Sequence, residues 1–214
     1  MLIAGGGIAG MAAGFAVARA GWQTRVFEQA AEFSEVGAGV QLGPNVTRIL
    51  QAWGLGDALK QVAAFPAGLH ARSLATGEVL ATLPLTDAVS KYGAPYVTLH
   101  RADLHGLLLQ AAAGEGVQVH SDAVVHRVFQ TSDTVTFDVM QHVHLRQHTA
   151  PASLAADGVW SPLRQQLLGD GLPAFTGHIA YRALVAQADL PMHLRSQDVS
   201  VWMGSQAHVV SYPV

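Results

Sequence analysis

The sequence predicts an α/β protein that opens with a strand–helix–strand unit and later becomes rich in β-structure. First, three glycines, Gly5, Gly7 and Gly10, stand between a short aliphatic strand and an apolar run of helical length. Second, an acidic residue, Glu28, stands at the end of the strand that follows. Third, strand-like patterning dominates from Phe175 onward. Strands that alternate with helices indicate a parallel sheet covered by helices.

The glycines fit the G-x-G-x-x-G pattern of a dinucleotide-binding turn. Gly5 permits the tight turn from strand to helix, Gly7 lets the backbone approach a pyrophosphate, and Gly10 lets the helix pack closely on the sheet. Ile8 and Ala9 lie within the motif, where the helix N-terminus presents N–H groups and partial positive charge to phosphates. The sequence therefore predicts a pyrophosphate site at residues 5–10.

The residues after the glycines support the same interpretation over two alternatives. Glu28 stands 18 positions after Gly10, where an acid accepts hydrogen bonds from an adenosine ribose. Residues 1–18 carry no charged side chain, so a signal peptide or a membrane span is an alternative. A signal peptide opens with positive charge, whereas the first charge here is Arg19. The apolar run is also interrupted by glycines and is short for a membrane span.

Composition restricts the class of protein further. The chain has 214 residues, of which 50% are hydrophobic and 13% charged, and its net charge is −3. Such a chain can bury an α/β core, and the absence of a basic block argues against nucleic-acid binding. It contains no cysteine, which excludes disulfides and thiolate chemistry. His142, His144 and His148 lie close in sequence, but no carboxylate or cysteine completes a ligand set, so we expect no metal site. We expect a cytoplasmic protein without stable membrane insertion.

Local signals predict the remaining elements. Glycines and a proline mark residues 33–45 as a loop, and Asn45 is a suitable N-cap for a helix through Trp53. Residues 68–84 read as a hairpin, residues 91–95 as a turn and residues 100–113 as a helix. A helix through Leu168 follows the turn at Asp157 and Gly158. The expected later strands are residues 117–120, 123–129, 135–139, 142–145, 153–156, 178–186, 199–203 and 207–214.

Three stretches together resemble the single-component FAD-dependent aromatic hydroxylases of the para-hydroxybenzoate hydroxylase superfamily. They are residues 5–10 with Glu28, the stretch HRADL at 100–104, and the stretch ADGVWSPLR at 156–164. Residues 35–45, 92–96 and 204–213 look like the salicylate hydroxylase and 3-hydroxybenzoate 6-hydroxylase branch. The resemblance covers essentially the whole chain and corresponds to the N-terminal half of the family's usual sequence.

The resemblance implies a fold and a division of the chain. The fold is a Rossmann-like FAD-binding domain of the glutathione-reductase type with an inserted β-rich substrate domain, truncated at the C-terminus. Residues 1–70 and 98–172 would form the FAD-binding domain, and residues 71–97 and 173–214 would form part of the substrate domain. An incomplete sheet of this kind predicts self-association.

The resemblance also implies residue roles. Gly5, Gly7 and Gly10 would hold the FAD pyrophosphate, with Ile8 and Ala9 between them, and Glu28 would hold the adenosine ribose. The other implied cofactor contacts are Gln41 near the flavin ring, Arg48 along the cofactor, Arg101 at the ribityl or phosphate part, and Asp157 with Gly158. His208 and Tyr212 would face the substrate as catalytic residues, with His208 as the base that activates a phenol.

The implied activity is hydroxylation of a phenolic or benzoate-type aromatic acid with NADH or NADPH and O₂, through a flavin hydroperoxide. A 6-hydroxynicotinate or polyketide-type hydroxylase would share these motifs. Two other functions stay open on the sequence: an inactive FAD-binding fragment and an NAD-dependent Rossmann dehydrogenase. The generic alternatives for single features are a plain turn at Asp157 and Gly158, a generic connection at 33–45, and an ordinary strand histidine at His208.

Overall fold

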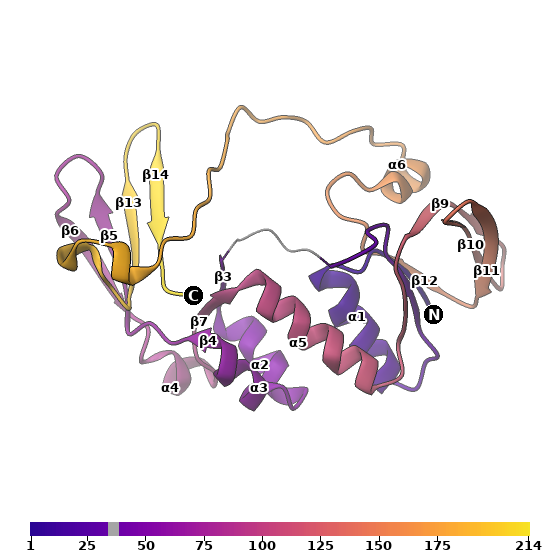
Figure 1. Cartoon of the computed structure of the whole chain (residues 1–214), viewed down its shortest axis with the longest axis horizontal. Coiled ribbons are helices and arrows are strands. Elements are labelled where there is room, and N and C mark those ends of the chain that lie inside the picture. Colours follow the sequence, from indigo (N-terminus) through magenta and orange to yellow (C-terminus); the bar gives the residue numbers. More distant parts are fainter. Residues whose placement is uncertain (34–38) are drawn as a thin grey trace. The chain divides into compact units, whose positions relative to one another are not determined.

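The computed structural model describes residues 1–33 and 39–214, and the chain forms two compact units (Figure 1). Unit 1 comprises Met1–Ser34 and His105–Ala180, and unit 2 comprises Glu35–Leu104 and Tyr181–Val214. The predicted assignment of residues to an FAD-binding domain and a substrate domain concerns function and stays a prediction.

Unit 1 contains the predicted strand–helix–strand unit. Strand β1 (Leu2–Ala4) leads into helix α1 (Ile8–Arg19), which returns the chain to β2 (Arg25–Phe27). A four-stranded sheet has the order β12-β1-β2-β8, with β8 at Gln118–His120 and β12 at Ser153–Ala155, and all its pairings are parallel. The three residues of β1 are at most 1% exposed, as expected of a strand covered on both faces. The apolar start of the chain is therefore a core strand followed by a 12-residue helix.

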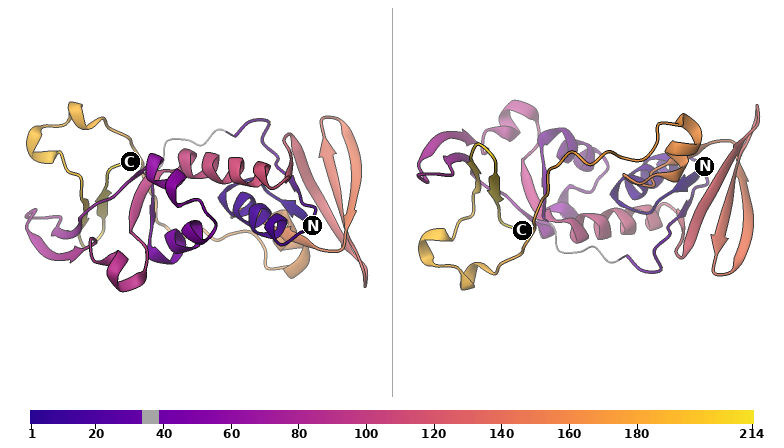
Figure 2. Two further views of the ribbon diagram at one scale, coloured as in Figure 1. Left: turned by 90° about the horizontal axis from the view of Figure 1, so that it is seen from below. Right: turned by 90° about the horizontal axis from the view of Figure 1, so that it is seen from above.

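A second sheet of unit 1 is antiparallel, and Figure 2 shows its three strands as one twisted sheet. It has the order β11-β10-β9, with β9 at Ala123–Gln130, β10 at Val135–Gln141 and β11 at His144–Ala150. Helix α6 (Pro162–Leu168) contacts β9 through Gln166, whose amide donates to the Val128 carbonyl at 2.6 Å and accepts from the Val128 N–H at 3.2 Å. Phe27, Phe137 and Leu163 belong to one buried cluster, so the sheets and α6 share a core.

Two histidines lie at the edge of this core. His120 stacks on Phe27 with ring centroids 5.1 Å apart, and the His148 ring lies 4.7 Å from the same phenylalanine. Burial lowers the pKa of both histidines from the usual 6.5, and the nearby Arg25 guanidinium lowers it further. The fold therefore favours the neutral form of both rings.

We expect acid to destabilise unit 1 through this pair. The unfolded chain binds protons at pH values where the folded histidines remain neutral, so the unfolding free energy falls as pH drops below about 6.5. Above that pH the pair contributes its full stability. His148→Phe should flatten this dependence, whereas the matched change Leu145→Phe, at an exposed position of the same strand without a titratable group, should leave it unchanged. Urea unfolding between pH 5 and pH 8 measures the effect, and equal slopes for wild type and His148→Phe would contradict it.

Unit 2 contains a small antiparallel sheet with helices around it. The sheet has the order β3-β7-β4, with β3 at Gly39–Leu42, β7 at Val97–His100 and β4 at Ala63–Ala64. Its helices are α2 (Pro44–Ala52), α3 (Gly56–Val62) and α4 (Ala88–Tyr92). The buried Thr47 of α2 donates a hydrogen bond of 2.6 Å to the Pro95 carbonyl. That bond ties α2 to the chain that enters β7, the strand that precedes helix α5 (Arg101–Gly114).

The second sheet of unit 2 has the order β14-β13-β5-β6. Its strands are β5 (Gly68–Ser73), β6 (Val79–Pro84), β13 (Val199–Met203) and β14 (His208–Ser211), and β13 pairs with β5 in parallel. Asp198 joins the starts of β13 and β5, because its Oδ1 accepts the N–H groups of Ala67 and Gly68 at 2.9 Å and its Oδ2 lies 3.2 Å from His70 Nε2. Burial opposes ionisation of Asp198, but these hydrogen bonds outweigh it and lower its pKa.

Several local predictions are wrong. Gly43 rather than Asn45 is the N-cap of α2, because Pro44 already occupies the first helical turn. Within the loop predicted at 33–45, residues 39–42 form a strand, and residues 34–38 lie outside the described residues. Residues 88–92 form α4, which the turn predicted at 91–95 overlaps, and its αL cap is Gly93. His142 lies in a turn with φ 53° rather than in a strand. Residues 178–186 form no strand in the described structure, since these exposed residues lack a pairing partner there.

Candidate nucleotide-binding site

The turn between β1 and α1 is shaped by its glycines. Gly5 has φ 95°, a conformation that side chains disfavour, and a Cβ there would collide with the Ala156 carbonyl. A Cβ on Gly10 would overlap the Gly5 carbonyl oxygen. Gly7 differs, because none of the described residues apart from its two chain neighbours has an atom within 4 Å of the position of its missing Cβ. Gly5 and Gly10 are thus required for packing, whereas Gly7 borders open space.

The N-terminus of α1 faces this space with unsatisfied donors. Gly7 is the N-cap, and within the described residues no side chain accepts a hydrogen bond there and no acid occupies the first turn. The first N–H groups of a helix, which include those of Ile8 and Ala9, lack intrahelical partners and carry partial positive charge. An anion such as a pyrophosphate can satisfy them.

Glu28 lies immediately after β2, beside the same turn. Its Oε2 accepts the Gly6 N–H at 2.6 Å and its Oε1 accepts the Ala30 N–H at 2.8 Å. Each carboxylate oxygen can accept more than one hydrogen bond, so these contacts hold the carboxylate in place and leave acceptor capacity for a ribose. The structure thus places the predicted ribose ligand next to the predicted pyrophosphate turn.

Asp157 lies on the other side of β1. Strand β12 pairs with β1, and the Ala156 N–H donates to the Ala4 carbonyl at 2.7 Å, so the chain reaches Asp157 beside Gly5. The Asp157 carboxylate accepts the Ser161 hydroxyl at 2.7 Å and the Leu163 N–H at 3.2 Å. Gly158 has φ 80°, as a tight turn after β12 requires. Asp157 therefore joins the carboxyl end of β12 to the N-terminus of α6.

This geometry gives a test that separates capping by Asp157 from ligand binding. Ser161 is the N-cap of α6 and accepts the Arg164 N–H, so Ser161→Ala should lower the unfolding free energy by about 1 kcal/mol. Asp157→Ala removes the hydrogen bonds that Asp157 accepts from Ser161 and Leu163 at the same helix N-terminus. If Asp157 also serves the nucleotide, Asp157→Ala should weaken FAD binding by about tenfold more than Ser161→Ala does. Titration of both variants with FAD measures their affinities. Equal affinities would show that Asp157 only stabilises the N-terminus of α6 and does not contact the nucleotide.

Within unit 2, Tyr96 interacts with both Gln41 and Tyr212. Gln41 is in β3, opposite Thr98 of β7, and its Oε1 accepts a hydrogen bond from the Tyr96 hydroxyl. Burial and then the charge of Tyr212 raise the pKa of Tyr96, which keeps that hydroxyl a donor. The Tyr212 ring packs against Gly39, where a Cβ would come within 2.5 Å of its Cε2 atom. Tyr96 thus orients the Gln41 amide, and Tyr212 packs against Gly39 of the same strand β3.

The other predicted residues of unit 2 are distributed over different elements. Arg48 lies in α2, where it lines a hollow of about 290 Å³ with Pro44, Asn45 and Tyr92. Arg101 is the exposed first residue of α5, as the sequence predicts. His208 opens β14, opposite Met203 of β13. Among the described residues, no hydrogen bond or ion pair joins Arg48 or His208 to Gln41, Tyr96 or Tyr212.

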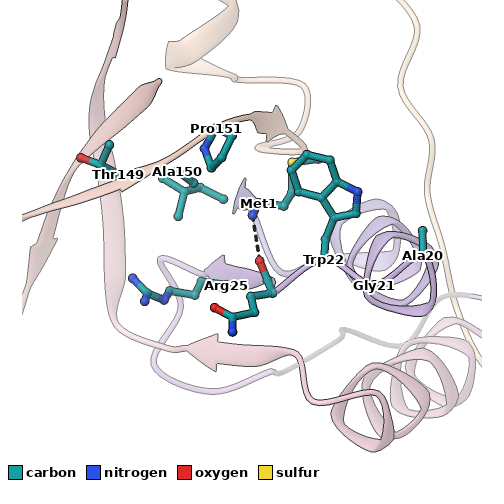
Figure 3. Close-up of a pocket in the computed structure, with 10 residues that line it drawn as sticks. Met1, Ala20, Gly21, Trp22, Arg25, Thr149, Ala150 and Pro151 are labelled. Carbon is teal, nitrogen blue, oxygen red and sulfur yellow. Dashed lines mark hydrogen bonds between the residues drawn. The ribbon is translucent and has the colours of Figure 1, made fainter. Parts of the chain in front are cut away.

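An open hollow of about 380 Å³ lies at the other end of the parallel sheet, away from the glycine turn (Figure 3). It is lined by Trp22, Arg25, Pro151 and the start of β1, where the Met1 amino group donates to the Gln23 carbonyl at 2.8 Å. These residues stand at the amino ends of β1, β2 and β12. Ligands of open α/β sheets bind at the carboxyl ends, so this hollow is not the candidate site.

The arrangement in unit 1 defines a nucleotide-binding α/β protein. Strand β1 lies between β2 and β12, so the glycine turn, Glu28 and Asp157 follow the carboxyl ends of three neighbouring strands at the point where the strand order reverses. Residues 1–212 match the family described as "FAD binding domain". The chain belongs to this family of FAD-binding proteins, which decides against the NAD-dependent dehydrogenase alternative.

Curated relatives of the chain include enzymes named for the hydroxylation of aromatic acids. The 3-hydroxybenzoate 6-hydroxylase of Polaromonas naphthalenivorans (strain CJ2) is 36% identical over 216 residues, covering 100% of this chain and 53% of the relative. The 6-hydroxynicotinate 3-monooxygenase of Pseudomonas fluorescens is 35% identical over 212 residues, covering 98% and 54%. The chain thus spans about half the length of these relatives.

Solved structures agree on the fold. A Klebsiella pneumoniae HpxO variant complexed with FAD superposes with a TM-score of 0.77 at 21% identity, covering 99% of this chain and 53% of that one. The p-nitrophenol 4-monooxygenase PnpA of Pseudomonas putida DLL-E4 gives a TM-score of 0.73 at 21% identity, covering 78% and 42%. The predicted α/β FAD-binding fold is therefore confirmed.

Two searches of the described residues, 1–33 and 39–214, give negative results. None of the helices there has the length and apolar character needed to cross a bilayer. Three or more histidine, aspartate or glutamate side chains do not gather anywhere in that part as a metal ion would need.

Proposed function

We propose that the chain is the FAD-binding part of an FAD-dependent monooxygenase that hydroxylates phenolic or benzoate-type aromatic acids. The observation that carries the proposal is the convergence of the glycine turn, Glu28 and Asp157 at the carboxyl ends of β1, β2 and β12, respectively. In this proposal residues 1–70 and 98–172 serve FAD, whereas residues 71–97 and 173–214 belong to the substrate side.

The residues of unit 1 fit the adenosine diphosphate part of FAD. The open space beside Gly7 and the uncapped N-terminus of α1 suit the pyrophosphate. Glu28 accepts hydrogen bonds from the adenosine ribose. The proposed flavin-side contacts are Gln41, Arg48, Arg101, Asp157 and Gly158, and the cations among them balance the negative charge of the cofactor.

The reaction needs a base as well as the cofactor. Bound FAD, reduced by NADH or NADPH, supplies the chemistry that activates O₂ for transfer to an electron-rich ring. A phenolate ring is more electron-rich than a phenol, and a histidine imidazole accepts such a proton near neutral pH. We assign this role to His208 and assign Tyr212 to orient the substrate. The names of the relatives, which specify hydroxybenzoate and hydroxynicotinate, support an aromatic acid as substrate.

The proposal includes a cellular setting and an assembly. NADH and NADPH are cytoplasmic reductants, and a chain without cysteine is compatible with that compartment. Strands β6 and β14 are the edges of their sheet, and Val209 and Val210 of β14 are 51% and 39% exposed. Exposed apolar edge strands favour pairing between copies, so self-association of the chain is part of the proposal.

Two experiments test the function. In the first, the purified chain is titrated with FAD, and we expect the visible bands of a bound flavin. In the second, residues 1–212 replace the matching part of the Polaromonas relative, and the FAD-loaded chimera is assayed for NADH and NADPH oxidation with 3-hydroxybenzoate, salicylate and 6-hydroxynicotinate. We expect oxidation coupled to hydroxylation, and its loss in His208→Gln. A chimera that holds FAD but hydroxylates none of these acids would contradict the proposed activity.

A further inference from the structure

His105 is a buried polar residue to which the sequence analysis assigns no role. It lies in α5, one helical turn after Arg101, and is 3% exposed. Its Nε2 lies 2.7 Å from the Gly6 carbonyl oxygen. A carbonyl oxygen only accepts hydrogen bonds, so His105 must carry a proton on Nε2 and donate it. The imidazole thus contacts the glycine turn directly.

The surroundings of His105 hold that hydrogen bond in place. The Phe33 ring lies 4.7 Å from the imidazole, centroid to centroid. On the other side of Gly6, its N–H donates to Glu28 Oε2 at 2.6 Å. A Cβ on Gly6 would come within 2.9 Å of both Glu28 and Phe33, so this turn has no room for a larger residue. Both peptide groups of Gly6 are therefore held, one by a carboxylate and one by an imidazole.

The Gly6 carbonyl belongs to the same peptide group as the Gly7 N–H. In a trans peptide the C=O and N–H bonds point in opposite directions, and every described peptide bond of the chain is trans. A carbonyl directed at His105 therefore directs the Gly7 N–H away from His105. Gly7 is the N-cap of α1, beside the open space where the pyrophosphate is proposed.

We propose that His105 is a positioning residue that sets the orientation of the Gly6–Gly7 peptide, and so aims the Gly7 N–H for the dinucleotide pyrophosphate. The inference rests on the proposed FAD site, but its structural part concerns only the protein. Without the imidazole donor the Gly6–Gly7 peptide can rotate, because two glycines offer little steric resistance. The loop would then present a carbonyl oxygen instead of an N–H to an anion.

The test compares His105→Gln with His105→Asn. The Gln amide nitrogen takes the place of Nε2 and keeps a donor for Gly6, whereas the shorter Asn cannot reach it. Phe33→Leu removes the ring contact but keeps the imidazole. Two quantities are measured on the purified chain: the FAD dissociation constant, from quenching of flavin fluorescence, and the amide resonance and hydrogen exchange of Gly7 without FAD.

We expect His105→Asn to weaken FAD binding by about tenfold or more and to shift the Gly7 resonance with faster exchange. His105→Gln and Phe33→Leu should stay near wild type in both readouts. Equal FAD affinity and equal Gly7 exchange in the Asn and Gln variants would overturn the role of His105. Failure of the wild-type chain to bind FAD would refute the cofactor site itself, while the Gly7 readout would still decide whether His105 orients the peptide.

Discussion

Gly10→Ala should lower the unfolding free energy of the chain by about 2 kcal/mol net and abolish FAD binding. The new Cβ overlaps the Gly5 carbonyl oxygen, which is backbone and cannot turn aside as a side chain can. Overpacking of this kind costs about 1–3 kcal/mol or more, which exceeds the gain of about 1 kcal/mol from replacing a helical glycine by alanine. Relief of the overlap moves α1 away from β1 and distorts the turn.

Gly14→Ala is the matched control in the same helix. A Cβ there meets Val117 and Val26 at 3.5 Å, an ordinary van der Waals distance. The helix-propensity gain then dominates, and we expect a stability change between zero and about +1 kcal/mol with unchanged FAD affinity. Urea unfolding and FAD titration of both variants test the contrast. Equal stability of Gly10→Ala and wild type would show that α1 does not pack on the turn as described.

Gly7→Ala, unlike Gly10→Ala, should leave the fold intact and weaken only FAD binding. Gly7 has φ −70° and ψ −173°, which alanine adopts readily, and no described atom lies within 4 Å of the new methyl group. The loss of a glycine N-cap costs less than about 1 kcal/mol. The methyl group enters the space proposed for the pyrophosphate, so we expect FAD affinity to fall by about tenfold or more.

Gly114→Ala provides the control for Gly7→Ala, because its Cβ also meets no described atom within 4 Å and it lies at the end of α5. It should bind FAD like wild type. If Gly7→Ala also kept full affinity, the pyrophosphate could not lie beside Gly7, and the site would have to be sought elsewhere in the chain.

The sequence predicts the N-terminal strand–helix–strand segment well, because the sequence signals for it are local and mutually consistent. The glycine spacing, the apolar run after it and Glu28 each belong to one short strand–helix–strand unit, which the structure reproduces as β1, α1 and β2. The pairing of β1 with β12 depends on contacts 151 residues apart (Leu2 to Ser153). Only the family resemblance indicates that Asp157 belongs beside the turn.

Local sequence patterns do not predict other parts of the fold and of the site. Residues 178–186 have the composition of a strand, but strand formation requires a hydrogen-bonding partner, which composition does not reveal. In the sequence Tyr96 stands out only as the last residue of the family-like stretch 92–96, and its hydrogen bond to Gln41 depends on the pairing of β3 with β7. His105 occupies a helical position with apolar neighbours, and its partner Gly6 is 99 residues away.

A comparison of FAD with FMN tests whether the chain binds a dinucleotide through the turn at Gly7 and Glu28. FMN carries the flavin ring, the ribityl chain and one phosphate, but lacks the pyrophosphate bridge and the adenosine. The proposed site uses the turn at Gly7 for the pyrophosphate and Glu28 for the adenosine ribose. We therefore predict that the purified wild-type chain binds FAD at least about a hundredfold more tightly than FMN, equivalent to about 2.7 kcal/mol. Equal affinities for the two flavins, or binding of neither, would contradict the account.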